Sequence, residues 1–229
     1  MPNNTDQGAA HRAALLQRMT RTGLYLVTDD RLDTATLLAR LGAALDAGAD
    51  VVQFRDKRDD LAAVAEAGRQ VAARCREAGA LFIMNDHAQL AVDLDADGLH
   101  VGQDDASPGE VRAIVGPDRI IGLSISHLHE LDAAVADPAL DHIGFGALYG
   151  SPTKTNAEPA GPAMLAEARK RVPFPIVGIG GVTAANLGPA FAAGADAVAV
   201  VSAVFSAPDP AAATRALLAA IAEARAARG

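Results

Sequence analysis

The sequence has no tryptophan, a single cysteine and few aromatic residues, which make up 3% of its 229 residues. The one cysteine, Cys75, cannot form an intramolecular disulfide, and the polar opening of the chain shows no apolar leader segment with a cleavage site. No run reaches the roughly 18 consecutive apolar residues of a membrane-spanning helix. We therefore expect a cytoplasmic protein with no membrane partner.

Positive charge is also scarce, because 20 lysines and arginines face 28 acidic residues and give a net charge of −8. Surfaces that bind nucleic acid or anionic membranes need a basic footprint, so neither partner is expected. Any anion must instead be held by a few local cations. Half of the residues are apolar, and a chain of this length buries about three quarters of its unfolded surface. These features predict one barrel-sized domain.

Eight short apolar runs alternate with segments of helical spacing, which is typical of a parallel sheet covered by helices. The runs are residues 24–28, 51–55, 81–84, 98–101, 120–124, 142–145, 175–179 and 197–201. The helical segments are residues 35–47, 61–78, 107–115, 128–136, 164–171, 184–193 and 210–227. This pattern predicts an α/β fold, a single (β/α)8 TIM barrel over residues 22–229, with residues 1–21 as a flexible extension. An open doubly wound sheet is the alternative.

A short internal repeat supports the barrel. The sequence AGADVV at 47–52 returns as AGADAV at 193–198, each where a helical segment meets an apolar run. Gly48 and Gly194 would then follow helix ends, where a left-handed backbone favours glycine. Chance repetition in an alanine-rich chain remains the alternative.

Cationic side chains gather at the end of the second predicted strand. In a TIM barrel the functional groups lie at the C-terminal ends of the strands and in the loops that follow. Strand alternation turns Gln53 and Arg55 to the same side, into the barrel mouth, and Lys57 follows two residues later. A buried cation needs a carboxylate or a bound anion. The second positive charge favours an anion, and an ion pair between Arg55 and an aspartate is the alternative.

Carboxylates follow the next two strands. Asn85 and Asp86 end the third strand, and Asp105 lies in the loop after the fourth. Oxygen ligands from separate loops suit Mg²⁺, which binds a few carboxylates and completes its octahedron with water and substrate phosphate. The two aspartates therefore predict a magnesium site beside the cations. The alternative for Asp86 is capping of a helix that begins near Ala88.

Two further segments favour phosphate binding. Ser151, Thr153 and Lys154 lie in a polar segment after strand six, which we expect to form a loop that closes on an anion, with a merely solvated loop as the alternative. After strands seven and eight, small residues allow backbone N–H groups to approach a phosphate, and the candidates there are Gly181, Val201 and Ser202. The three cations and Mg²⁺ carry more positive charge than the two aspartates neutralise. This excess favours a diphosphate in addition to a monophosphate.

These motifs, in this order, resemble those of thiamine-phosphate synthases. The matching segments are Leu24–Asp29, Val52–Lys57, Asn85-Asp86, Asp97–Asp105, Gly122–Ser124, Ser151–Lys154, Gly178–Val182 and Ala199–Ala203. The resemblance implies a magnesium-dependent transferase that joins hydroxymethylpyrimidine diphosphate to hydroxyethylthiazole phosphate, with or without a 2-carboxylate. Thiamine monophosphate and pyrophosphate are the implied products. A homo-oligomer is compatible with the sequence.

The resemblance also implies roles for individual residues. Two amides would contact the aminopyrimidine or its diphosphate: Gln53 and Asn85. Three cations would bind the diphosphate and act in catalysis: Arg55, Lys57 and Lys154. Asp86 and Asp105 would hold Mg²⁺, and Ser124 would lie beside the reacting methylene group. Hydroxyls and backbone groups would bind phosphate at Ser151, Thr153, Gly181, Val201 and Ser202.

Two positions depart from the family pattern. The usual Thr-x-Thr-Lys is Ser151–Lys154 here, which keeps the hydroxyl, and a histidine common two residues after Ser124 is replaced by Ser126, with His127 next. The closest alternative is a thiazole tautomerase, which binds no diphosphate. A Schiff-base aldolase using Lys154 and a non-catalytic phosphate-binding regulator are the others.

Overall fold

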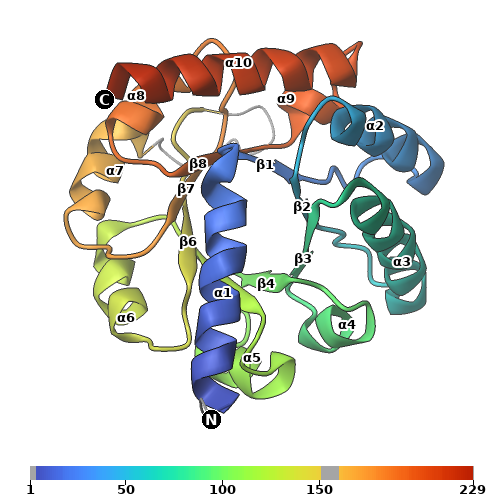
Figure 1. Cartoon of the computed structure of the whole chain (residues 1–229), viewed down its shortest axis with the longest axis horizontal. Helices are drawn as coiled ribbons and strands as arrows, with labels where there is room; N and C mark the ends of the chain where they lie inside the picture. Colours follow the sequence, from blue (N-terminus) through green and yellow to red (C-terminus); the bar gives the residue numbers. More distant parts are fainter. Residues whose placement is uncertain (1–3, 151–159, 229) are drawn as a thin grey trace.

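The computed structural model describes residues 4–150 and 160–228 and contains a closed barrel of eight parallel strands (Figure 1). The strands are β1 (Leu24–Val27), β2 (Val51–Phe54), β3 (Leu81–Asn85), β4 (Gly98–Val101), β5 (Ile120–Ile125), β6 (His142–Phe145), β7 (Ile176–Ile179) and β8 (Ala197–Val200). Each strand pairs with the next, and β8 closes the barrel on β1 with Leu24 opposite Val198. The predicted single (β/α)8 barrel is confirmed, and closure excludes the open sheet.

Helices surround the strands (Figure 1). They are α1 (Asn4–Arg21), α2 (Thr34–Asp46), α3 (Leu61–Ala78), α4 (Ala88–Asp93), α5 (Pro108–Val115), the 3₁₀ turn η1 (Leu128–Glu130), α6 (Leu131–Ala136), α7 (Gly161–Arg169), α8 (Gly188–Ala192), α9 (Ser202–Phe205) and α10 (Pro210–Arg228). Every predicted helical segment contains a helix. Gly48 and Gly194 follow α2 and α8 with φ of +106° each, so the predicted left-handed positions are confirmed.

Polar residues fix where the helices begin. The Asp33 carboxylate accepts the Thr36 N–H at 2.9 Å at the start of α2. Ser107 and Glu110 form a reciprocal capping box at the start of α5, where Pro108 occupies the first turn. Such caps satisfy N–H groups that have no acceptor within the helix. They therefore set the lengths of the loops that carry the site.

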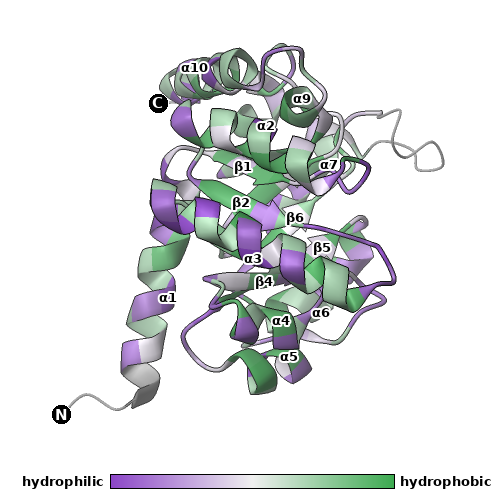
Figure 2. Cartoon of the chain, turned by 90° about the vertical axis from the view of Figure 1, so that its right-hand side faces the viewer, coloured by the Kyte–Doolittle hydropathy of each residue, from purple (hydrophilic) through white to green (hydrophobic). Residues whose placement is uncertain are grey.

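The prediction of a flexible extension is wrong for residues 4–21, which form α1. This helix lies across one end of the barrel (Figures 1 and 2). Leu15 and Met19 are 3% and 0% exposed and pack against interior side chains of the strands. Arg12 binds Asp141 at 3.0 Å, immediately before β6, and Arg18 binds the Gly79 carbonyl at 3.0 Å, before β3. The helix therefore covers the N-terminal end of the barrel, because one apolar stripe is buried there.

The barrel interior changes from apolar to polar toward the C-terminal ends of the strands. The apolar part is a cluster that includes Val51, Leu81 and Ile120, next to α1. Farther along the strands, His100 on β4 pairs with Gly122 on β5, which pairs with His142 on β6.

Within the described part of the chain, no helix is both long and apolar enough to cross a membrane.

Candidate active site

Arg55 lies at the end of β2, where it contacts the loop after β1. Its N–H donates to Thr28 Oγ1 at 2.8 Å, and that hydroxyl donates to the Arg55 carbonyl at 2.9 Å. The guanidinium Nη1 binds Asp30 Oδ2 at 2.6 Å. The expected alternative, an ion pair of Arg55 with an aspartate, is therefore present. The arginine side chain is still 39% exposed, and within the described residues its guanidinium group hydrogen-bonds only to Asp30, so its other N–H groups can bind an anion.

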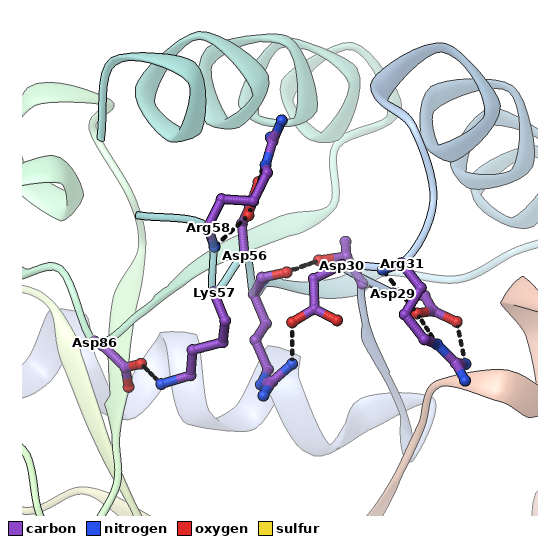
Figure 3. A network of polar contacts seen from close by, with 9 residues as sticks. Asp29, Asp30, Arg31, Asp56, Lys57, Arg58 and Asp86 are labelled. Atoms are coloured by element: carbon purple, nitrogen blue, oxygen red, sulfur yellow. Dashed lines mark hydrogen bonds and ion pairs between the residues drawn. The ribbon is translucent and has the colours of Figure 1, made fainter. Parts of the chain in front are cut away.

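Lys57 reaches from the same loop to the end of β3. Its ammonium group forms an ion pair with Asp86, while Asp56 and Arg58 pair with each other and point away (Figure 3). Asp86 has a left-handed backbone with φ of +61°, which is costly for a residue other than glycine. The alternative role of Asp86 as a helix cap is wrong, because His87 precedes the first residue of α4.

Asp86 and Asp105 act directly on each other. Burial and the neighbouring carboxyl group of Asp105 raise the pKa of Asp86, against the opposing effect of Lys57. Burial would raise the pKa of Asp105 as well, but the Gly102 N–H at 2.8 Å, Asp86 and Lys57 together lower it. Two carboxyl groups this close favour one shared proton over two negative charges. The predicted carboxylate pair is therefore brought together, as a site for a cation requires.

Three polar side chains line the mouth from inside. Gln53 and Asn85 are 5% and 8% exposed, and Gln53 Nε2 donates to the Tyr25 hydroxyl at 3.0 Å. Ser124 is half-buried on β5, and its Oγ lies 2.9 Å from His100 Nε2. The three residues lie on β2, β3 and β5. They lie toward the same end of the barrel as the cations of the β2 loop.

Small residues follow β7 and β8 on the other side of the mouth. Gly181 has φ of +65°, and a Cβ there would lie 2.7 Å from the Gly150 carbonyl oxygen, so only glycine fits. Val201 precedes α9, and Ser202, its first residue, is exposed. Because β7 and β8 pair with Ile179 opposite Ala199, the two turns are neighbours. The three predicted phosphate-binding positions are therefore adjacent.

Some residues of the site were outside the sequence prediction, and others are outside the described structure. Ser151, Thr153 and Lys154, with the loop they were expected to form, lie outside the described residues. No sequence motif predicted a role for Thr28 or Asp30. The polar run directly after an apolar strand was the available signal, since this is where a barrel places functional groups.

Comparison with known proteins decides between the families that share this barrel. The family model described as thiamine monophosphate synthase matches residues 24–204. The chain belongs to the thiamine monophosphate synthase family. The match begins at β1 and ends within α9, so it covers all eight strands, and α1 and α10 lie outside it.

Relatives of known name agree with this family. The thiamine-phosphate synthase of Thiobacillus denitrificans is 44% identical over 82% of this chain and 89% of its own length. That of Thioalkalivibrio sulfidiphilus is 43% identical over 86% of this chain and 94% of its own. Among solved structures, thiamine phosphate pyrophosphorylase from Pyrococcus furiosus is similar with a TM-score of 0.81 and 31% identity, covering 90% of this chain and 98% of that one. The expected resemblance is thereby confirmed.

Proposed function

We propose that this member of the thiamine monophosphate synthase family is a transferase that couples hydroxymethylpyrimidine diphosphate with hydroxyethylthiazole phosphate. Thiamine monophosphate and pyrophosphate are the products. The observation that carries the proposal is the convergence of Arg55 and Lys57 with the Asp86 and Asp105 pair at the ends of β2, β3 and β4. A diphosphate needs such a concentration of charge.

The carboxylate pair suits Mg²⁺ by the chemistry of its donors. Asp86 and Asp105 offer carboxylate oxygens from two loops, and their mutual effect on pKa indicates that a cation would relieve the repulsion between their charged forms. We propose these two residues as the magnesium ligands. Bound Mg²⁺ would stabilise negative charge on the departing diphosphate.

The residues of the chain position both substrates. Gln53 and Asn85, both buried at the mouth, would orient the aminopyrimidine, and Arg55 and Lys57 would bind its diphosphate. Lys154, Ser151 and Thr153 are proposed to add contacts to phosphate. Backbone groups at three neighbouring positions would hold the thiazole phosphate: Gly181, Val201 and Ser202. These contacts fix the thiazole nitrogen against the reacting carbon, which converts a bimolecular reaction into an oriented one.

The proposed reaction breaks one bond and forms one bond. The methylene C–O bond breaks with its electron pair on pyrophosphate, and the aminopyrimidine delocalises the positive charge left on carbon. The thiazole nitrogen then forms the C–N bond. Ser124 lies beside the proposed reacting carbon and leaving group, and Arg55, Lys57 and Lys154 stabilise the charge that develops on pyrophosphate. The scheme needs neither a nucleophile nor a strong base from the protein.

The test is product formation from the two substrates, followed by chromatography, with Mg²⁺ present or removed by EDTA. Thiamine monophosphate formed only with metal supports the proposal. Isomerisation of a thiazole phosphate alone would favour the tautomerase, and borohydride trapping of a carbonyl substrate would favour a Schiff-base aldolase. We also propose a cytoplasmic location for the reaction, as expected from the sequence.

A further inference from the structure

Two histidines lie inside the barrel directly beneath the proposed reaction site. His142 on β6 is 1% exposed and His100 on β4 is 8% exposed, and their ring centroids are 5.6 Å apart. Within the described residues, both nitrogens of His142 and Nδ1 of His100 have no hydrogen-bond partner. Buried polar atoms are nearly always paired, with protein or with an internal water. These three nitrogens therefore call for an explanation.

Gly122 creates the space in which the two rings meet. It lies between the histidines in strand register, opposite His100 on one side and His142 on the other. A Cβ on Gly122 would be 2.3 Å from His142 Nε2 and 2.4 Å from His100 Nδ1. The two nitrogens thus approach the same point and are closer together than the sum of these distances. One water molecule, or a small rotation of the rings, connects nitrogens over such a span.

The remaining hydrogen bonds give this connection a direction. Both rings are buried, and a neutral imidazole ring has one donor and one acceptor nitrogen. On the β1 side, the Tyr25 oxygen accepts from Gln53, which leaves the hydroxyl proton to be donated elsewhere. The Tyr25 ring lies beside that of His142, with centroids 6.5 Å apart. No hydrogen bond joins Tyr25 and His142 in the described residues, so a bridging water would carry this contact to His142 Nδ1, which would leave Nε2 as the donor.

The consequence passes through His100 to the site. When His142 Nε2 donates toward His100 Nδ1, the proton of His100 is on Nε2, which lies 2.9 Å from Ser124 Oγ. Ser124 then accepts from His100, and its own hydroxyl proton is free to be donated to substrate. With the opposite tautomers, the Ser124 hydroxyl would donate its proton to His100 Nε2 and could not donate it to substrate. Tautomer choice by a neighbouring group is the usual way in which a histidine is set for one task.

We propose that His142 is a positioning residue that fixes the tautomer of His100, and that His100 thereby aims the Ser124 hydroxyl proton at the leaving pyrophosphate. The catalytic part of this inference rests on the proposed function. The hydrogen-bond part does not, because it is a property of the free protein. If His142 had only a structural role, an apolar side chain in its place would stabilise the protein, because buried nitrogens that lack partners would be removed.

The experiment compares His142→Leu with His142→Gln. Leucine removes both nitrogens, whereas the glutamine amide nitrogen takes the place of Nε2. We expect the single-turnover rate constant to fall about 3- to 10-fold in His142→Leu, the loss expected for one hydrogen bond, with KM nearly unchanged. Glutamine should restore most of the rate. The matched control is His129→Leu, at an exposed histidine stacked on His127, which should behave as the wild type.

A spectroscopic readout tests the connection without any reaction. In protein with ¹⁵N-labelled histidine, we expect His100 to be protonated on Nε2, with Nδ1 shifted by an accepted hydrogen bond. That shift should be lost in His142→Leu and return in His142→Gln. A wild-type His100 protonated on Nδ1, or an unchanged shift in His142→Leu, overturns the proposal. So does a His142→Leu enzyme that is more stable and equally fast.

The two readouts separate the possible failures. A wild-type enzyme that forms no thiamine monophosphate contradicts the proposed function, and the ¹⁵N shifts then decide the hydrogen-bond connection alone. A wild-type enzyme that forms product, with His142→Leu at the same rate, overturns the positioning role and leaves the proposed function standing.

Discussion

Replacing Gly122 by alanine should destabilise the protein, because the new methyl group would occupy the meeting point of two histidine rings. It would lie 2.3 Å from His142 Nε2 and 2.4 Å from His100 Nδ1, well inside van der Waals contact. Both rings are buried, so they can move aside only if neighbouring groups shift as well. Overpacking of this kind typically costs about 1–3 kcal/mol of the free energy of unfolding. Displacement of His100 should also weaken its contact with Ser124 and lower the rate of coupling.

Urea unfolding of Gly122→Ala, followed by circular dichroism, measures this cost. The matched control is Gly42→Ala, because Gly42 lies within α2 and a Cβ there meets no atom within 4 Å. Alanine should stabilise that helical position by about 0.5–1 kcal/mol. If Gly122→Ala unfolds at the same urea concentration as the wild type and with the same slope, the rings do not meet at Gly122, and His142 does not act on His100 there.

Three further predictions concern charged groups. Asp105→Ala should largely abolish turnover with the fold intact, because Asp105 is exposed, and unchanged turnover would remove the metal assignment. Burial and Asp105 raise the pKa of Asp86, so protons should compete with Mg²⁺ for this carboxylate. The Mg²⁺ affinity measured by calorimetry should therefore fall as pH falls, and an affinity that does not change with pH would contradict this. Burial lowers the pKa of His100 and His142 to about 4 and 3, so below about pH 6.5 the unfolded chain binds protons that the native chain excludes. The free energy of unfolding should therefore drop as pH falls from 6.5, by about 1.4 kcal/mol per pH unit for each histidine. Urea titrations at pH 7, 6 and 5 measure this slope, and His142→Leu should halve it.

The barrel was predictable because its strands are short, apolar and regularly separated by helical segments. Each of these features depends on residues near one another in the chain. The helix over 4–21 was missed because its apolar stripe, centred on Leu15 and Met19, is narrow and is stabilised only by contact with the end of the barrel. Most helical stability comes from such packing, which local sequence does not report.

Some residues of the site could be predicted from the sequence and others could not. Arg55, Lys57 and Asp86 were predictable, because the ends of barrel strands place polar groups at one face. Asp30 as the partner of Arg55 was not, since that pairing joins residues 25 positions apart through the contact between β1 and β2. His142 was less predictable still. Its importance depends on the register that places Gly122 between two histidines, and register follows from the closed barrel.

The most direct test of the account is ³¹P NMR of the wild-type protein with pyrimidine diphosphate and thiazole phosphate, with and without Mg²⁺. The account predicts that the diphosphate signals disappear while thiamine monophosphate and pyrophosphate appear in equal amounts, and only when both substrates and Mg²⁺ are present. No thiamine monophosphate from folded, magnesium-loaded protein would contradict the central claim.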